Sequence, residues 1–591
     1  MGTSTTGATT EQTESIWRRP AAAFKIWASE LRQRESQLFL VLSLVIGGTV
    51  GAIVVAFIVL TERVGAYCYP PGGLGLRRLL VPIGGSLVTG FLLTKYFPQA
   101  RGSGIPQTKV ALFLHGGRIK VKTVFGRFFC SAAALGCGIS LGREGPSVQV
   151  GSGLASNVGR RLGLSQDNVK ALVPVGAAAA LAAAFNTPIA AVLFSLEEIM
   201  GDLHAPLLGS VVISAATSWV VLHLFLGDNP LFHVPAYQLT HPAEFAAYAV
   251  LGVLGGFVSV AFVKMTLGMR GRLRRLPAST EWWQPAIGGL IVGAIGFFRP
   301  EVEGAGYDFV SKVLTGNFIL PVVAVLVVLK LVATASCYAS GNTGGIFGPS
   351  LFMGAMLGAA VGTVVHHWFP VYTATAGAYA LVGMGSTFAG IIRTPLTSVF
   401  MIFELTRDYT IVVPLMIANM ISFYISYKLQ PKPIYEALNE QDGIHLPDPE
   451  TERSRHSKTV AEVMRVVPPL VSPDTPLHDL TPHPFGGLYL VGQGDELMGV
   501  LRASDVMAAL ENHEYDAPVE GMMRPGPAES DTSALEEFPH VHADQPVELA
   551  LERMGSDHVS MLPVLDRANV KHVRGVVLGD DILRSYGVPL T

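Results

Sequence analysis

Gly142-Arg143-Glu144-Gly145-Pro146-Ser147 is the stretch that decides the fold, because the chain repeats its pattern in a second half. The triplet Gly145-Pro146-Ser147 recurs as Gly348-Pro349-Ser350, an offset of 203 (349 − 146). Two other landmarks recur in the same order, at offsets of 202 (304 − 102) and 207 (395 − 188). They are Arg101-Gly102-Ser103-Gly104-Ile105 with Glu303-Gly304-Ala305-Gly306-Tyr307, and Thr187-Pro188 plus Glu197 with Thr394-Pro395 plus Glu404. Three matches in one order predict a chain built from two similar halves.

The composition places most of the chain in a lipid bilayer. Of 591 residues, 50% are hydrophobic and 15% are charged, and the mean hydropathy is +0.42. These values exclude an ordinary soluble globule, a collagen and a disordered chain. The first uncharged run, Leu38–Leu60, is long enough to cross a hydrocarbon core of about 30 Å. Basic residues precede it, so the positive-inside rule predicts a cytoplasmic N-terminus. Later apolar windows are interrupted by Gly and Pro, as in transporters built from inverted repeats with broken helices.

The last part of the chain has the composition of a water-soluble domain. From Thr451 to Thr591 there are 11 Lys and Arg against 22 Asp and Glu, a net charge of −11, whereas the whole chain has −3. We expect this acidic tail to be cytoplasmic too, which implies an even number of membrane crossings. The four cysteines lack metal-ligand spacing, so we expect neither a metal site nor a disulfide framework. We predict a cytoplasmic N-terminal segment (1–36), a first repeat (37–230), a second repeat (243–435), a linker (436–458) and two soluble modules (459–515 and 516–591).

Two glycine-rich turns predict an anion site between the halves. Gly102-Ser103-Gly104-Ile105-Pro106 and Gly344-Gly345-Ile346-Phe347-Gly348-Pro349 each precede a helical run, with proline near its first turn. Helix N-termini present unpaired N–H groups and a partial positive charge, and glycine lets a backbone approach closely. Such turns suit an anion held without a full cationic side chain, because conduction requires weak contacts. A single glycine-rich turn can equally serve helix packing, and the repeat favours the anion site.

Two glutamates in apolar surroundings are candidates for proton transfer. An acid at the centre of a membrane helix costs about 2.5–3.5 kcal/mol, so Glu144 needs a reason to be there. Either it pairs with Arg143, although adjacent helical residues do not face each other, or it is a titrating gate that competes with the anion when charged. Glu197 has the repeat mate Glu404, which favours a structural role. Glu198 has no acidic mate in the second half and is left free for proton transfer.

Two other functional classes fit the sequence poorly. Gly138-Ile139-Ser140-Leu141-Gly142 matches the nucleophile elbow of hydrolases, but no α/β pattern surrounds it, so we expect no enzyme. A divalent-cation transporter would need several carboxylates that converge on one octahedral site. The repeated turns offer glycine and backbone N–H groups instead.

These motifs resemble the CLC family of chloride channels and chloride/proton exchangers, over roughly residues 37–440. The resemblance implies an all-α polytopic membrane fold with inverted-repeat broken helices, followed by a soluble α/β pair of CBS modules. The residues that carry it are Gly102, Gly104 and Pro106 in the first motif, Gly142, Arg143, Gly145 and Pro146 in the second, Gly345 and Pro349 in the third, and Tyr435 in Pro433-Ile434-Tyr435-Glu436.

The resemblance also implies roles for individual residues. Glu144 would be the external gate, and serine rather than proline at position 103 favours chloride over nitrate. Exchangers commonly carry an acid at the position of Glu198 as the internal proton acceptor, which favours proton-coupled chloride exchange. The alternative is a passive chloride channel gated by voltage or pH. The groups that would hold a dehydrated chloride are the hydroxyls of Ser103 and Tyr435 and the backbone N–H groups of Ile346 and Phe347.

Partners and location follow from the same resemblance. We expect transported chloride and protons, a multi-pass position in the cell membrane, a homodimer with a pore in each subunit, and no nucleic acid. No cofactor is required. The two CBS modules open with Val463-Met464-Arg465 and Met522-Met523-Arg524, and relatives often bind an adenine nucleotide between such modules. Here Arg502 and Leu578 replace the usual Ser or Thr, so nucleotide binding and a purely dimerising or regulatory role both stay open.

Overall fold

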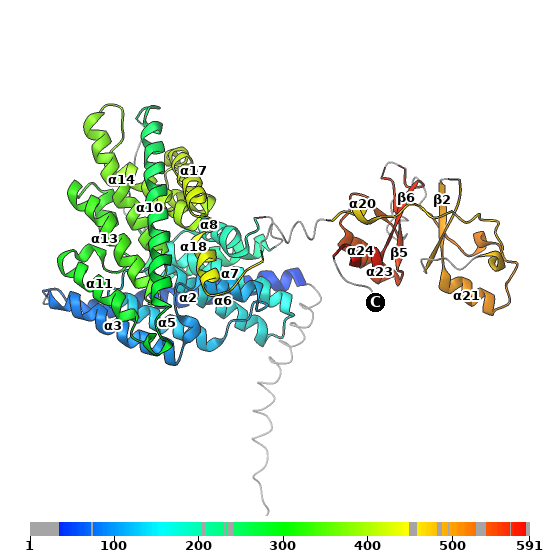
Figure 1. The fold of residues 1–591 in the computed structure, drawn as a ribbon, viewed down its shortest axis with the longest axis horizontal. Coiled ribbons are helices and arrows are strands. Elements are labelled where there is room, and N and C mark those ends of the chain that lie inside the picture. Colours follow the sequence, from blue (N-terminus) through cyan, green and yellow to red (C-terminus); the bar gives the residue numbers. More distant parts are fainter. Residues whose placement is uncertain are drawn as a thin grey trace, which may run out of the picture. The chain divides into compact units, whose positions relative to one another are not determined.

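The chain forms two compact units, which are described separately. A computed structural model describes residues 35–72, 75–203, 207–228, 231–232, 234, 240–447, 458–480, 487–494, 496–526, 539–567 and 569–586. The first unit ends at Leu446 and the second begins at Pro447. Most of the predicted N-terminal segment (1–36) lies outside the described residues. Figure 1 labels the elements of both units.

The first unit is helical and contains two runs of helices and a final helix. In its described residues, eight helices are long and apolar enough to span a membrane, which confirms the predicted polytopic all-α domain. The first run is α2 (Glu35–Cys68), α3 (Leu76–Lys95), α4 (Ile105–Phe113), α5 (Val121–Gly136), α6 (Glu144–Arg161), α7 (Gln166–Phe185), α8 (Pro188–Phe194), a π-helical turn (Ser195–Met200) and α9 (Leu208–Leu226). The second is α10 (Glu244–Leu273), α11 (Pro285–Phe298), α12 (Tyr307–Leu314), α13 (Leu320–Ala339), α14 (Phe347–Trp368), α15 (Ala376–Ile392), α16 (Pro395–Thr406) and α17 (Val412–Leu429), and α18 (Ile434–Gln441) follows.

The two runs pack in the same way. Helix α2 packs on α9 as α10 packs on α17, and α6 packs on α7 as α14 packs on α15; Figure 1 shows the long α10 beside α17. The short helices α4 and α12 begin after Gly104 and Gly306, whose φ angles of +105° and +81° favour glycine. A Cβ at Gly104 would also lie only 2.4 Å from the carbonyl oxygen of Gly145. The glycines of these landmarks are therefore required by conformation and by close backbone approach.

Glu197 and Glu404 cap helices of the opposite half. The carboxylate of Glu197 accepts hydrogen bonds from the first N–H groups of α16, and that of Glu404 accepts from the first N–H groups of α8. These N–H groups have no acceptor inside their own helices, and a carboxylate there is also favoured by the helix dipole. The donor–acceptor distances are 3.3 Å from Leu396, 2.9 Å from Thr397, 2.8 Å from Ile189 and 2.7 Å from Ala190. Such reciprocal contacts are what two symmetry-related halves predict.

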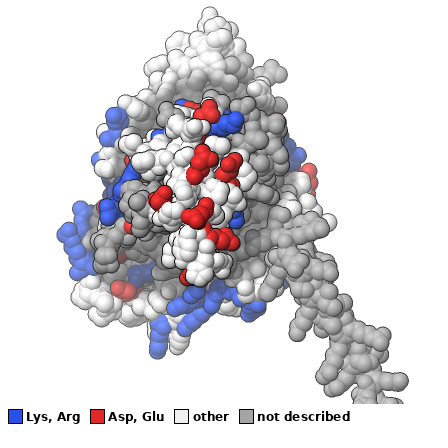
Figure 2. Space-filling model, turned by 90° about the vertical axis from the view of Figure 1, so that its right-hand side faces the viewer, with Lys and Arg blue, Asp and Glu red and all other residues white. Residues whose placement is uncertain are grey.

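The described residues of the second unit form a small α/β structure with two three-stranded sheets. Figure 2 shows acidic side chains on the face of this unit that carries α21, in keeping with its net negative charge. Strands β1 (Leu488–Gln493), β2 (Glu496–Arg502) and β3 (Arg524–Pro525) are antiparallel; β4 (Val541–His542) runs parallel to β5 (Met561–Leu565), which is antiparallel to β6 (Val573–Leu578). The described helices are α20 (Val460–Val463), α21 (Ala503–Glu511), α23 (Val547–Asp557) and α24 (Gly579–Ser585).

The opening segments of the two modules are exchanged. The sequence interpretation placed each opening segment with its own module. In the structure, the backbone of Arg465 exchanges hydrogen bonds of 2.8 and 3.0 Å with Val576 in the second sheet. The second opening segment pairs with the first sheet, where Arg524 lies opposite Val500. Each opening segment therefore satisfies the free edge of the other sheet. The structure also extends α18 to Gln441, inside the stretch predicted as a linker; the domain limits themselves stay predictions.

Candidate functional site

Two helix N-termini meet at the centre of the helical unit. Gly142 and Gly345 form an isolated antiparallel bridge in which each N–H lies 2.7 Å from the carbonyl oxygen of the other. The bridge places the starts of α6 and α14 side by side, one from each half. Both helices direct unpaired N–H groups and partial positive charge to the same place. Among the described residues, the N–H groups of Ile346 and Phe347 make no hydrogen bond.

The hydroxyl groups of Ser103 and Tyr435 lie at this convergence. Both side chains are buried, and neither hydroxyl makes a hydrogen bond within the described part of the chain. Ser103 sits at the start of α4, where a Cβ on Gly145 would lie 2.6 Å from its Oγ. Tyr435, in the first turn of α18, lies within electrostatic range of Ser103, Glu144 and Glu198. Two buried O–H donors beside two helix N-termini suit a small anion.

Glu144 is fully buried in the first turn of α6. One of its carboxylate oxygens accepts a hydrogen bond from the N–H of Gly348 at 3.4 Å, and the other accepts one from the Tyr307 hydroxyl. The guanidinium of Arg143 instead donates to the carbonyl oxygen of Ala184 at 3.0 Å. Both members of the Arg143–Glu144 pair are described, and no ion pair joins them. The structure therefore favours the second interpretation, in which the Glu144 carboxylate takes a position beside the N-terminus of α14.

Glu198 has a partner that the sequence did not reveal. Its carboxylate lies 2.8 Å from the ammonium group of Lys109, and the Glu198 side chain is 8% exposed. Lys109 is on α4, four residues after the Ile105 that begins the helix. The two residues are 89 positions apart, so no local spacing points to the pair. An acid that sequence analysis left free is thus held in an ion pair close to Tyr435.

A buried cation lies behind the Ser103 turn, where it bonds to the backbone and is not one of the groups expected to hold the anion. Arg127 on α5 is fully buried, and its guanidinium donates to the carbonyl oxygen of Gly102 at 2.5 Å and to Thr343 at 2.8 Å. None of its hydrogen-bond partners in the described residues is a carboxylate. Lys330, 203 positions later, bonds to the carbonyl oxygens of Val302 and Gly304 in the matching turn. The sequence held this signal, because the offset equals that of the Pro146 and Pro349 landmark.

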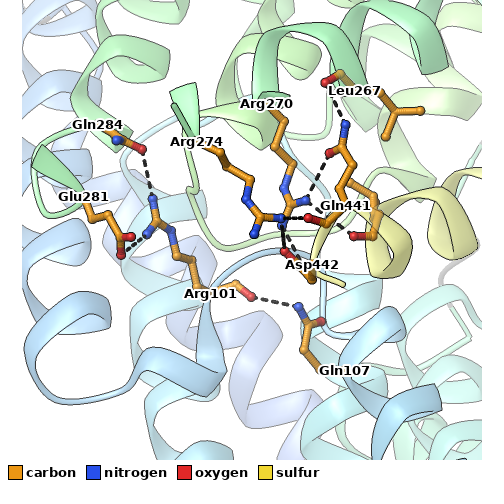
Figure 3. A network of polar contacts seen from close by, with 10 residues as sticks. Arg101, Gln107, Leu267, Arg270, Arg274, Glu281, Gln284, Gln441 and Asp442 are labelled. Atoms are coloured by element: carbon orange, nitrogen blue, oxygen red, sulfur yellow. Dashed lines mark hydrogen bonds and ion pairs between the residues drawn. The ribbon is translucent and has the colours of Figure 1, made fainter. Parts of the chain in front are cut away.

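A polar network joins α4, α10 and α18 next to the site (Figure 3). Asp442, just after α18, lies 2.8 Å from Arg270 on α10 and 2.5 Å from Arg274, which directly follows α10. Arg101 lies 3.0 Å from Glu281. A cavity of about 370 Å³ is lined by these arginines and by Gly102, which precedes Ser103. The network fixes the end of α18, whose first turn carries Tyr435.

The fold and site define a multi-pass membrane protein that handles a small anion, and family comparison agrees. The family described as voltage gated chloride channel matches residues 84–427, which is more than half of the chain. The chain therefore belongs to the CLC family: it is a CLC-type anion transporter and not an enzyme. A CBS domain matches residues 532–587. These matches confirm the predicted family, the CLC-type membrane fold and the soluble α/β CBS region.

Three solved structures resemble the chain. A slow cyanobacterial Cl⁻/H⁺ antiporter is 24% identical with a TM-score of 0.63, covering 68% of this chain and 97% of its own. A eukaryotic CLC transporter is 19% identical with a TM-score of 0.57, covering 92% of this chain and 97% of its own. A CLC-type fluoride/proton antiporter is 24% identical with a TM-score of 0.59, covering 68% and 98%. At these identities the likeness shows the fold alone.

Proposed function

We propose that the protein exchanges chloride for protons across a membrane. The observation that carries this proposal is the buried Glu144 carboxylate at the meeting point of two helix N-termini, close to two hydroxyl donors that have no partner among the described residues. The Ser103 and Tyr435 hydroxyls and the N–H groups of Ile346 and Phe347 hold the dehydrated chloride. Fluoride accepts the same hydrogen bonds, and the choice of chloride rests on the family resemblance at position 103.

Chloride and proton transport are coupled because the anion and the charged Glu144 carboxylate compete for the same positive electrostatic potential. A charged Glu144 and an anion both seek the N–H groups at the start of α14, so one disfavours the other. Protonation removes the charge of Glu144 and releases the N–H groups for the anion. Anion binding and protonation are then thermodynamically linked, and the linkage works in both directions. Glu198 delivers the proton on the other side of Tyr435.

A passive chloride channel is the second candidate, and the ion pair with Lys109 favours it. The carboxylate of Glu198 lies 2.8 Å from the ammonium group of Lys109, a contact that gives this buried acid a structural reason to be there. If Glu198 is only a structural partner of Lys109, chloride moves without a stoichiometric proton. Glu198→Ala separates the candidates, since proton transport is lost from an exchanger and anion flux with its pH response is unchanged in a channel.

The test of the leading proposal is flux from reconstituted vesicles, followed with a chloride electrode and a pH electrode together. A pH gradient should drive chloride uphill in the wild type. We expect Glu144→Gln to abolish proton transport and to keep chloride flux. Glu62→Gln, which changes an exposed glutamate of α2, is the matched control and should behave as wild type. Proton transport that persists in Glu144→Gln would refute the gate assignment, and substitution of fluoride for chloride measures anion preference.

We propose the assembly and location on the same family grounds. The protein is a homodimer in the cell membrane with a pore in each subunit, and both termini are cytoplasmic. Several helices present large exposed apolar side chains, among them Leu224 and Phe225 on α9 and Met416 and Met420 on α17, which suit lipid or a second subunit. Cross-linking in native membranes tests the dimer. Calorimetric titration of the full chain with ATP tests whether the CBS pair binds an adenine nucleotide.

A further inference from the structure

Tyr307 contacts the gate from the half opposite to the one that carries it. It is the first residue of α12, in the second half, and its hydroxyl donates a hydrogen bond to the carboxylate of Glu144 in the first half. Ser103 and Tyr435 approach the site from α4 and α18 instead. The carboxylate of Glu144 thus has a hydroxyl partner of its own, separate from the two hydroxyls assigned to the anion. Tyr307 is not among the residues assigned to proton transfer or to anion binding.

The tyrosine side chain is held in place on several sides. The guanidinium carbon of Arg143 lies 5.4 Å from the centre of its ring, and the buried Phe232 meets the ring edge-on at 5.6 Å. A Cβ at Gly348 would lie 2.7 Å from the hydroxyl oxygen, so a larger residue at Gly348 would displace it. Gly306, with its φ of +81°, sets the start of α12. Because the ring is packed before the hydrogen bond forms, little rotamer entropy opposes that bond.

We propose that Tyr307 is the positioning residue that holds the charged Glu144 carboxylate in the closed position, and this rests on the proposed gate role of Glu144. A phenolic O–H donates to a carboxylate in a charge-assisted hydrogen bond, which is stronger than a bond between neutral groups. When Glu144 is protonated, the hydroxyl oxygen accepts from the carboxylic acid in a weaker, neutral bond. The hydrogen bond between Tyr307 and Glu144, which we call the latch, is therefore strong when Glu144 is charged and weak when Glu144 is protonated. Protonation of Glu144 then allows its side chain to leave the closed position.

The proposal predicts the effect of removing one oxygen atom. Tyr307→Phe keeps the ring packing and deletes the donor, so the charged gate leaves the closed position more often. We expect chloride flux in neutral solution to rise and flux in acidic solution to stay the same. The ratio of acidic to neutral flux should fall about tenfold, the loss that follows from one charge-assisted hydrogen bond. Fewer protons should move per chloride, because more anions pass a gate that is open and charged.

Two further variants and a second measurement show whether Tyr307 acts as a latch or only by packing. Tyr379→Phe is the matched control, since Tyr379 is buried and stacks on Tyr248 outside the site; it should match wild type. In the Glu144→Ala background, Tyr307→Phe should change neither flux nor its pH response, because the carboxylate it would hold is gone. Chloride calorimetry in detergent is a second measurement: Tyr307→Phe should bind chloride more tightly than wild type, and only when Glu144 is present.

Each outcome decides one of the two proposals. If Tyr307→Phe keeps the wild-type flux ratio and chloride affinity while Glu144→Gln loses proton transport, the proposed role of Tyr307 is wrong. The proposed gate role of Glu144 is then retained. If Tyr307→Phe has equal effects with and without Glu144, its role is packing and the latch is again wrong. If Glu144→Gln itself transports protons, the gate proposal fails whatever Tyr307→Phe does. A lower flux ratio that depends on Glu144 supports the latch.

Discussion

The ion pair of Lys109 and Glu198 lies close to Tyr435 and is nearly closed to solvent, with side chains 18% and 8% exposed. Breaking a buried pair leaves one charge without a partner and costs about 3–5 kcal/mol. We therefore expect Lys109→Met to lower the melting temperature in detergent. The double variant Lys109→Met with Glu198→Gln removes both charges and should recover most of the loss. Scanning calorimetry of the three proteins measures this difference.

The same double variant tests function separately from stability. With the protonatable side chain of Glu198 replaced by an amide, proton transport should stop while chloride flux continues. A double variant as unstable as Lys109→Met would show that the loss does not come from leaving the Glu198 carboxylate without its partner.

A histidine of the soluble unit predicts a local pH dependence. The carbonyl of Tyr515, together with the carboxylates of Asp479 and Asp516, raises the pKa of His478 above its ordinary value of 6.5. A raised pKa in the folded state means that the stabilisation is complete below 6.5 and disappears as the pH rises through the folded value. We expect His478→Gln to lower the melting temperature of this unit in acidic solution more than in alkaline solution. Calorimetry across that range checks the sign, and an equal loss at all pH values would contradict it.

At the scale of elements, the reciprocal caps couple the two halves. Each carboxylate satisfies two N–H groups at the start of a helix in the other half, and loss of a buried acceptor leaves them unsatisfied at about 1–3 kcal/mol. We expect Glu404→Ala and Glu197→Ala to lower the melting temperature by similar amounts. Glu62→Ala on the surface of α2 is the control. A large effect from one cap and none from the other would show that the halves are not energetically equivalent.

The elements of the repeat were predictable because their signals are local. Proline at a first helical turn and glycine before it mark helix starts in any context, and a nearly constant offset then identifies the matching start in the other half. Contacts between distant elements carry no such signal. Lys109 reaches Glu198, and Tyr307 reaches Glu144, only because the helices cross in space. Tyr307 was part of a recognised landmark, but nothing in its neighbours indicates where its hydroxyl is directed.

Two features of the structure were not predicted from the similarity of the two halves. Arg127 and Lys330 differ by the same offset as Pro146 and Pro349, so the repeat also places this pair of cations at matching positions. The exchanged opening segments of the two predicted CBS modules could not be found in this way. Both opening segments end in Met-Arg and both sheets have a free edge, so sequence similarity alone does not say which segment pairs with which sheet.

At the scale of the whole molecule, the covalent route from the soluble unit to the anion site is short. The chain leaves the helical unit at Leu446, five residues after α18 ends at Gln441. Helix α18 is eight residues long and carries Tyr435 in its first turn. A pull on the chain at Leu446 would therefore act on the helix that presents a proposed chloride ligand. The contact that resists it is the clamp formed by Asp442 with Arg270 at the end of α10 and Arg274 just after it (Figure 3).

This clamp yields a prediction for the intact protein. The carboxylate of Asp442 makes hydrogen bonds of 2.8 and 3.0 Å to Arg270, and a further one of 2.5 Å to Arg274. Such a bidentate network is stronger than a single exposed ion pair. Without it, α18 is less well ordered and Tyr435 must be repositioned when the anion binds. We expect Asp442→Ala to weaken chloride binding about two- to tenfold by calorimetry, because the anion then has to order its own ligand.

The control for the clamp is Asp516→Ala, which removes an exposed carboxylate of the soluble unit and should leave chloride affinity unchanged. Arg270→Gln should resemble Asp442→Ala, since it breaks the same contact from the other side. If Tyr435→Phe already reduces chloride affinity, Asp442→Ala should add little to it, because both changes act on one hydroxyl. Full additivity of the two losses would mean that Asp442 acts on the anion through its own charge and not by ordering Tyr435.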